Sequence, residues 1–194
     1  MNVMASITSI ADDEPQAFKL RFEHYELLDR AGTFQDRRVE LIEGTLVEMS
    51  PQQRPHSYAK NELTFRLRLA LDALGSSLSA QSEVTLPLGP HSGAEPDIAL
   101  TDAPRGQGYI PVDSVKLVVE VADTSLRFDV GKKQTAYADA GLPEYWVVDV
   151  NGRQVHQFWA ASDGVYTHSR IVPLDGELRS ATMPELAIDG SGIL

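Results

Sequence analysis

The chain has 194 residues, a formal net charge of −11, 42% hydrophobic residues and no cysteine. This size fits one domain with a substantial core, and the lack of cysteine excludes disulfide scaffolds, thiolate metal sites and cysteine nucleophiles. The acidic balance argues against a protein that coats nucleic acid through a broad basic face, although a site built from carboxylates to hold cations would itself add negative charge. The N-terminal sequence has no signal-peptide pattern, and no apolar run approaches the roughly 18 residues that span a bilayer. We therefore expect a cytoplasmic protein with no membrane segment.

The N-terminal quarter of the sequence predicts a tail, a helix and a β-hairpin. Residues 1–17 are polar and small, which is typical of a flexible tail and leaves 18–194 as a single domain. Apolar residues from Phe18 to Ala31 recur at three- and four-residue spacing, and Gly32 follows as a helix stop. Val39–Met49 has two apolar runs around Glu43-Gly44, which predicts a hairpin that ends at Pro51.

The middle of the chain begins with the longest helical pattern, from His56 to about Leu74, with leucines along one stripe and Gly75 as its end. The segments that follow are predicted as a weakly alternating strand, a loop, a strand and an irregular connection: 79–86, 89–93, 94–100 and 102–114. Asp97 stands directly beside the apolar residues of the third of these segments. It is the first acidic residue at a position where an apolar one is expected.

Lys116–Asp149 predicts a strand, a loop, a helix and a second strand, and it contains a second misplaced acid. Glu120 lies inside Leu117–Ala122, a continuous apolar run of the kind found in strands buried on both faces. A carboxylate there costs several kcal/mol unless a cation, a metal or a hydrogen-bond donor meets it. The helix, Val130–Ala140, is closed by Gly141. Glu120 is therefore a candidate functional residue.

The C-terminal part predicts a β-meander. Glu144–Val150 is a strand, Asn151-Gly152 is a hairpin turn, and two further strands follow at 154–160 and 165–172 before a tail from Pro173. The order of elements favours an α/β (α+β) fold with a mixed central sheet. A Rossmann fold and a phosphate-binding loop are excluded, because the glycine patterns that both need are missing.

Two carboxylates that converge from neighbouring strands make a hard-oxygen site for Mg²⁺ or Mn²⁺, and Asp97 and Glu120 are placed for this. Such a metal suits phosphodiester chemistry, in which a nearby lysine can orient the attacking water. Lys132 and Lys133 are adjacent, so they face about 100° apart on a helix. We expect Lys133 to point at the sheet, because Tyr137 lies one turn on along the same face.

Pro96-Asp97, Glu120-Val121 and Lys133 resemble the PD-(D/E)xK signature of the restriction-endonuclease-like nuclease superfamily. A longer ordered set resembles the Uma-two family of restriction endonucleases over roughly residues 18–190. It adds segments 40–51 and 141–149, His56 and Tyr137-Ala138. This sequence departs from the superfamily signature at Ala122, where the strand lysine would stand.

The resemblance implies a restriction-endonuclease-like core, with the N-terminal hairpin and C-terminal meander added to a central mixed sheet flanked by helices. It implies an endodeoxyribonuclease that acts on DNA with Mg²⁺ or Mn²⁺. The catalytic residues that it implies are Glu40, Asp97, Glu120 and Lys133. Asp97, Glu120 and the backbone carbonyl of Val121 would hold the metal, and His56 and Tyr137 are candidates for substrate contact or support.

Other interpretations remain open for several of these residues. Glu120 could be a structural ion-pair partner of Lys133 or Arg127, and Asp97 could cap a loop. Glu40 could be a solvated residue of an edge strand, and His56 could be a helix cap or a surface group. Tyr145, Trp146 and Trp159 are interpreted as core or interface aromatics, and Glu43, Glu48 and Glu95 as solvated. Because of Ala122 and the acidic balance, the alternative function is a catalytically silent DNA-binding or protein-interaction module. A homodimer is also expected, since the meander exposes strand edges.

Overall fold

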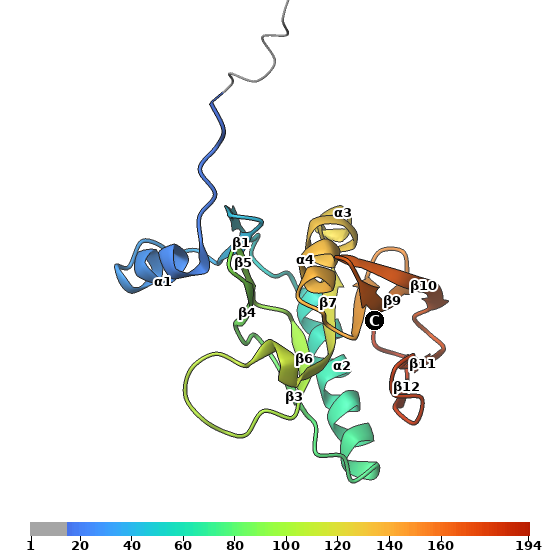
Figure 1. Ribbon diagram of the computed structural model, residues 1–194. Coiled ribbons are helices and arrows are strands. Elements are labelled where there is room, and N and C mark those ends of the chain that lie inside the picture. The colour runs from blue at the N-terminus through green and yellow to red at the C-terminus, as the bar shows by residue number, and fades with distance from the viewer. Residues whose placement is uncertain (1–14) are drawn as a thin grey trace, which may run out of the picture.

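The computed structural model describes residues 15–194, which form helices and three β-sheets (Figure 1). Most of the predicted tail, residues 1–17, lies outside the described part. The helical segments are α1 (Phe22–Arg30), α2 (Arg54–Ala73), the 3₁₀ turn Val112–Ser114, α3 (Leu126–Phe128), the π-helical turn Asp129–Lys133 and α4 (Gln134–Asp139). Within residues 15–194, no helix has the length and apolar character that a bilayer crossing requires.

The central sheet has six strands in the order β10-β9-β8-β7-β6-β3. Their bounds are β3 (Ser79–Gln81), β6 (Ile98–Thr101), β7 (Val115–Ala122), β8 (Glu144–Asp149), β9 (Gln154–Ser162) and β10 (Val165–Pro173). β7 and β8 pair in parallel and the other neighbours pair antiparallel, so the predicted mixed sheet is confirmed. The parallel pair needs a crossover, and the helical segment Leu126–Asp139 provides it.

Two smaller sheets flank the central one (Figure 1). The first has the order β2-β1-β5-β4, with β1 (Val39–Ile42), β2 (Thr45–Glu48), β4 (Leu86–Gly89) and β5 (Ser92–Ala94). The second pairs β11 (Glu177–Arg179) with β12 (Ala187–Asp189). The β1–β2 hairpin is as predicted, and its turn residues Glu43 and Gly44 both have positive φ, which glycine adopts without strain.

The two faces of the central sheet pack against different helices. Odd-numbered residues of β7, such as Val119 and Val121, share a core with the leucine stripe of α2. Even-numbered ones, such as Val118 and Ala122, share the other core with Ala136 and Tyr137 of α4. Successive strand side chains point to opposite faces, so Glu120 lies on the face that α4 covers.

The sequence predictions were wrong for four segments. The first helix begins at Phe22 rather than Phe18, because the preceding chain runs beside the hairpins, where Leu20 N donates to Gly44 O at 3.0 Å. Segment 89–93 is not a free loop but the turn and second strand of the β4–β5 hairpin, and β5 pairs with β1. Gly93 has no side chain to show an alternating pattern, and a Cβ there would clash with the Phe22 ring.

Two further segments also differ from their predicted secondary structure. The strand predicted over 94–100 is divided, because β5 ends at Ala94 and β6 begins at Ile98, so that Glu95–Asp97 links the two larger sheets. The tail from Pro173 forms β11 and β12, whose Leu178 and Ile188 join the core under α2. Short strands with little alternation carry too weak a pattern to be recognised in the sequence.

Candidate functional site

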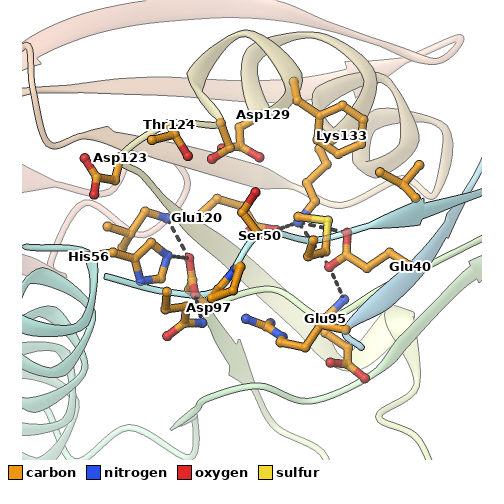
Figure 2. A pocket seen from close by; sticks show the side chains of 18 of the residues that line it. Glu40, Ser50, His56, Glu95, Asp97, Glu120, Asp123, Thr124, Asp129 and Lys133 are labelled. Atoms are coloured by element: carbon orange, nitrogen blue, oxygen red, sulfur yellow. Dashed lines mark hydrogen bonds and ion pairs between the residues drawn. The ribbon is translucent and has the colours of Figure 1, made fainter. Parts of the chain in front are cut away.

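A cavity of about 590 Å³ opens where the link Glu95–Asp97, the C-terminal end of β7 and the helix after it meet. Five charged side chains that are almost fully buried line it: Glu40, Asp97, Glu120, Asp129 and Lys133. Figure 2 shows the acidic groups and Lys133 gathered around this space. Ionised groups at this depth are stable only when they are paired, so their contacts determine what the site can do.

Lys133 and Glu120 form the buried centre of the site. Lys133 Nζ donates to Glu120 Oε1 at 2.9 Å and to Glu40 Oε1 at 3.1 Å, and it lies 3.0 Å from Glu40 Oε2. Burial opposes the charge on Lys133, but the carboxylates of Glu120, Glu40 and Asp129 outweigh it and raise the lysine pKa. Burial raises the pKa of Glu120 to about 8 despite the Lys133 charge, with contributions from the Asp97, Asp129 and Glu40 charges.

Glu40 reaches this centre from β1. Its Oε1 also accepts a hydrogen bond from Glu95 N at 3.0 Å, so one carboxylate joins the first hairpin, the link between the sheets and the helix. Sequence pattern alone left Glu40 undecided between a solvated edge residue and a site residue. The structure buries it to 2% exposure, which excludes the solvated interpretation.

Asp97 lies beside this centre, held by donors from α2 and β7. Its Oδ2 accepts from His56 Nε2 at 3.0 Å and from Val121 N at 2.8 Å. Burial favours the neutral acid, but the hydrogen bond and charge of His56 and the Val121 N–H outweigh it and lower the pKa of Asp97. His56 is therefore a partner of Asp97 rather than a surface cap.

Tyr137 and Asp129 complete the acidic group. Tyr137 OH donates to Glu120 Oε1 at 2.7 Å, and burial holds the tyrosine pKa well above its usual value. Asp129 accepts a hydrogen bond from Ser125 Oγ, while its Oδ1 is buried without a partner in the described part of the chain. Burial raises the pKa of Asp129 to about 6, although Lys133 and Ser125 oppose the shift.

One π-helical turn carries two buried charged residues of the site. It runs from Asp129 to Lys133, and both of these end residues are buried while Lys132 is exposed. π-Turns inside helices are frequent at functional sites. The expectation that Lys133 rather than Lys132 points at the sheet is thus consistent with the structure, although the helix begins four residues earlier than predicted, at Leu126.

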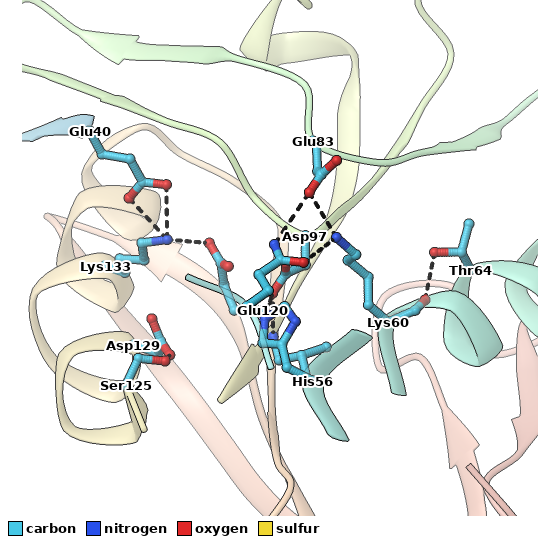
Figure 3. A network of polar contacts seen from close by, with 12 residues as sticks. Glu40, His56, Lys60, Thr64, Glu83, Asp97, Glu120, Ser125, Asp129 and Lys133 are labelled. Atoms are coloured by element: carbon cyan, nitrogen blue, oxygen red, sulfur yellow. Dashed lines mark hydrogen bonds and ion pairs between the residues drawn. The ribbon is translucent and has the colours of Figure 1, made fainter. Parts of the chain in front are cut away.

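A second polar network extends from Asp97 toward the protein surface (Figure 3). Gln52 Nε2 donates to Asp97 Oδ1 over a long 3.4 Å, and Lys60 Nζ binds Gln52 Oε1 at 2.7 Å and Glu83 Oε1 at 2.8 Å. Lys60 is buried on α2, one turn after His56. The network therefore contacts the Asp97 Oδ1 atom only through the long hydrogen bond from Gln52, which is a weak donor contact.

The carboxylates that face the cavity fit a divalent cation of the hard-oxygen class. Mg²⁺ typically takes only one or two protein carboxylates and keeps several waters. In residues 15–194, Glu120 Oε2 has no hydrogen-bond partner and Asp97 Oδ1 has only the long contact from Gln52. No group of three or more His, Asp or Glu side chains in the described residues is placed to hold a metal ion. A metal here would therefore depend on two carboxylates, a backbone carbonyl and water.

The structure brings together the sequence-predicted residues Glu40, His56, Asp97, Glu120, Lys133 and Tyr137, while Arg127 is exposed. It also adds Asp129, Gln52 and Lys60, which the sequence analysis missed. Two of these had a detectable signal, since Asp129 precedes Lys133 by four residues and Lys60 follows His56 by four, the spacing of one helix face. Gln52 had none, because it lies in a segment without regular structure.

Outside the site, most predictions agree with the structure. Tyr145 and Trp146 are fully buried core residues, and Trp159 lies on the β9–β10 surface, where Arg170 packs over its ring. Glu43 and Glu48 are exposed. Glu95 is only partly exposed and accepts a hydrogen bond from Thr85, so the prediction that it is solvated was wrong.

Comparison with known proteins gives one family. The family model that matches is Uma2, described as "Putative restriction endonuclease", and it covers residues 22–190. Among solved structures, the chain is similar to a crystal structure of a putative nuclease of DUF820 from Anabaena variabilis ATCC 29413. The TM-score is 0.65 and the identity 15%, over 81% of this chain and 90% of that one, so this likeness shows the fold. A search of curated proteins gave no match.

Proposed function

Because the chain belongs to the Uma2 family, as its motifs predicted, we propose that it is a metal-dependent endodeoxyribonuclease that hydrolyses phosphodiester bonds in DNA. The observation that carries the proposal is Lys133, buried between Glu40 and Glu120 in the cavity that Asp97 also lines. Buried charges are weak evidence for stability, since apolar residues could often replace them at no loss. Their presence in the lining of a cavity favours a chemical role.

In the proposed site, Asp97, Glu120 and the backbone carbonyl of Val121 would hold Mg²⁺ or Mn²⁺. When bound, the ion supplies charge stabilisation for the phosphoryl group and a water acidified toward neutral pH. His56 and the Val121 N–H keep Oδ2 of Asp97 in place, and Tyr137 fixes Oε1 of Glu120. These contacts leave the opposite oxygen of each carboxylate for the cavity.

Lys133 would orient the attacking water. An ammonium has three N–H donors, and two of them are used by Glu120 Oε1 and Glu40 Oε1. In the proposed mechanism, the third would point at a water or a phosphate oxygen in the cavity that Lys133 lines. Glu40 would act through Lys133, since it pairs with the same ammonium.

Cleavage of supercoiled plasmid DNA in the presence of Mn²⁺ tests the proposal. Wild-type protein should nick or linearise the plasmid, and Asp97→Ala and Glu120→Ala should abolish this while far-ultraviolet circular dichroism stays unchanged. Asp123→Asn is the matched control, because Asp123 lines the same cavity but is only partly buried. Equal cleavage by wild type and both alanine variants would reject the assignment.

A second candidate, a catalytically silent nuclease fold that acts as a DNA-binding or protein-interaction module, has a specific observation in its favour. Lys133 neutralises Glu120 at close range, and a pair that is satisfied in this way can be purely structural. Calorimetric titration with Mg²⁺ and Mn²⁺ separates the two candidates. Binding that depends on Asp97 supports the nuclease, whereas no binding by the wild type supports the silent module.

We also retain the homodimer as a proposal. β10 forms one edge of the central sheet, and most of its residues are exposed, including Val165 and Ile171. An exposed edge with apolar side chains is a ready surface for self-pairing. Light scattering that gives the mass of two chains would support the dimer, and a mass of one chain would reject it.

A further inference from the structure

Arg38 lines the cavity that holds the acidic group. It precedes β1 by one residue and Glu40 by two, and both residues line the cavity. Residues two apart on an extended chain point to the same face, so Arg38 and Glu40 share one side. Met49 N donates to Arg38 O at 2.8 Å, which fixes the Arg38 backbone to the neighbouring strand of the hairpin.

The charges around the cavity leave Arg38 in a distinctive position. Among lysine and arginine residues, two line the cavity: Arg38 and Lys133. Lys133 is buried and committed to Glu40 and Glu120. Among the described residues, the Arg38 guanidinium makes no ion pair within 4.0 Å and no hydrogen bond, although its positive charge contributes to a lowered pKa of Glu83 behind the hydrogen bond from Lys60. Arg38 is therefore the cation of the cavity that is still available.

We propose that Arg38 binds a phosphodiester group of the DNA strand, next to the group that is cleaved at Asp97 and Glu120. The inference rests on the proposed function and names the group that receives the substrate backbone. A polyanion that enters a cavity lined by Glu40, Asp97, Glu120 and Asp129 is repelled until an uncommitted cation meets it. The planar guanidinium fork can bind two phosphate oxygens at once, which an ammonium cannot.

The neighbouring Arg37 provides the contrast that makes the inference specific. Arg37 lies on the other side of the chain, lines a different cavity and pairs with Glu48 at 3.2 Å. It is more exposed than Arg38 and carries the same charge. A general attraction between positive residues and DNA would therefore make Arg37 at least as important as Arg38, whereas a phosphate contact inside the cavity would make only Arg38 important.

Fluorescence anisotropy with a fluorescein-labelled DNA duplex, in Ca²⁺ and over a range of salt concentrations, compares wild type, Arg38→Gln and Arg37→Gln. For Arg38→Gln we expect affinity about tenfold weaker and a salt dependence reduced by about one phosphate contact. Arg37→Gln should bind like the wild type. Urea unfolding and Mn²⁺ titration of both variants should match the wild type, because neither guanidinium touches Asp97 or Glu120 in the described structure.

The outcomes separate this inference from the proposed function. The role of Arg38 is overturned if Arg38→Gln binds DNA like the wild type, or if it weakens binding no more than Arg37→Gln does. This holds even if the wild type cleaves plasmid. Selective loss of binding in Arg38→Gln supports it even if no cleavage is found, in which case only the nuclease assignment fails. A wild type with no affinity for duplex or single-stranded DNA overturns both.

Discussion

The ammonium of Lys133 lies 2.9 Å from Oε1 of Glu120, although the lysine belongs to the helix that follows the strand of the glutamate. The superfamily signature would put a lysine at position 122, two residues after Glu120 and on the same strand face. That position holds Ala122, which is fully buried among residues packed under α4. The helical segment Leu126–Asp139 covers the sheet face on which Glu120 lies. A lysine of that segment can therefore reach the same carboxylate.

Replacement of Lys133 by methionine should destabilise the protein strongly. It would leave Glu40 and Glu120 as buried carboxylates without their cation, which typically costs 3–5 kcal/mol, a rough figure for breaking a buried pair. Lys132→Met is the control, because Lys132 is exposed and its loss should change stability by less than about 0.5 kcal/mol. Urea denaturation measures both, and equal stabilities would contradict the account of Lys133 as a committed partner.

Loss of the Tyr137 hydroxyl should cost more than loss of the Tyr145 hydroxyl. Both rings are fully buried, but Tyr137 OH donates to the Glu120 carboxylate and Tyr145 OH to the backbone carbonyl of Asp129. Hydrogen bonds to charged groups contribute roughly twice as much as neutral ones, about 2 kcal/mol against about 1. Chemical denaturation of Tyr137→Phe and Tyr145→Phe at about pH 9, above the Glu120 pKa of about 8, gives the comparison. A smaller loss for Tyr137→Phe would mean that Glu120 is not ionised in the folded protein.

Asp129 should make stability fall as the pH rises through the mildly acidic range. Burial raises its pKa from 3.8 to about 6, so the folded protein keeps this proton at pH values where the unfolded chain has lost it. The contribution of Asp129 to stability therefore decreases between about pH 4 and 6, by at most roughly 3 kcal/mol for a shift of about two pKa units. Asp129→Asn lacks this titration and keeps an acceptor for Ser125. The stability difference between wild type and variant should grow in favour of the variant over that range, and a constant difference would contradict the prediction.

Replacement of Glu144 by glutamine should reduce the stability of the fold without changing metal binding at the site. Its buried carboxylate accepts hydrogen bonds from Trp146 Nε1 and from Ser180, Ala181 and Thr182, and it does not line the cavity. Glutamine would point an N–H₂ group at donors, and the variant should lose about 3 kcal/mol of stability. Its Mn²⁺ affinity should equal that of the wild type. Glu177→Gln, at an exposed carboxylate, controls for the charge change.

Several features of the fold could be predicted because they depend on local pattern. The leucine stripe of α2, the apolar run of β7 and the glycine turn at Gly44 each signal their own structure. The β4–β5 hairpin could not be predicted, since Gly93 and Pro87 hide its alternation, and proline is tolerated there only because β4 is a sheet edge. Pairing between β1 and β5 depends on residues about 50 positions apart, which no local pattern encodes.

Residues of the site could be predicted from the sequence where a charged residue interrupts an apolar run. Glu120 and Asp97 stand out because they interrupt apolar runs, and Lys133 follows from helix geometry. Asp129 stayed hidden, because an acid near a helix start is usually a solvated group that favours the helix dipole. Its four-residue spacing from Lys133 could have placed it on the same helix face, and in the structure these two residues are the buried ends of the π-helical turn.

The central claim is that Asp97 and Glu120 hold a divalent cation beside Lys133, and a crystal soaked in Mn²⁺ tests it most directly. We expect an anomalous difference peak in the cavity, at coordination distance, about 2.1 Å, from one oxygen of Asp97 and one of Glu120, with Lys133 still bound to Glu40. A fully soaked crystal with no peak between these two carboxylates, and with the contacts of Lys133 and His56 unchanged, would contradict the claim.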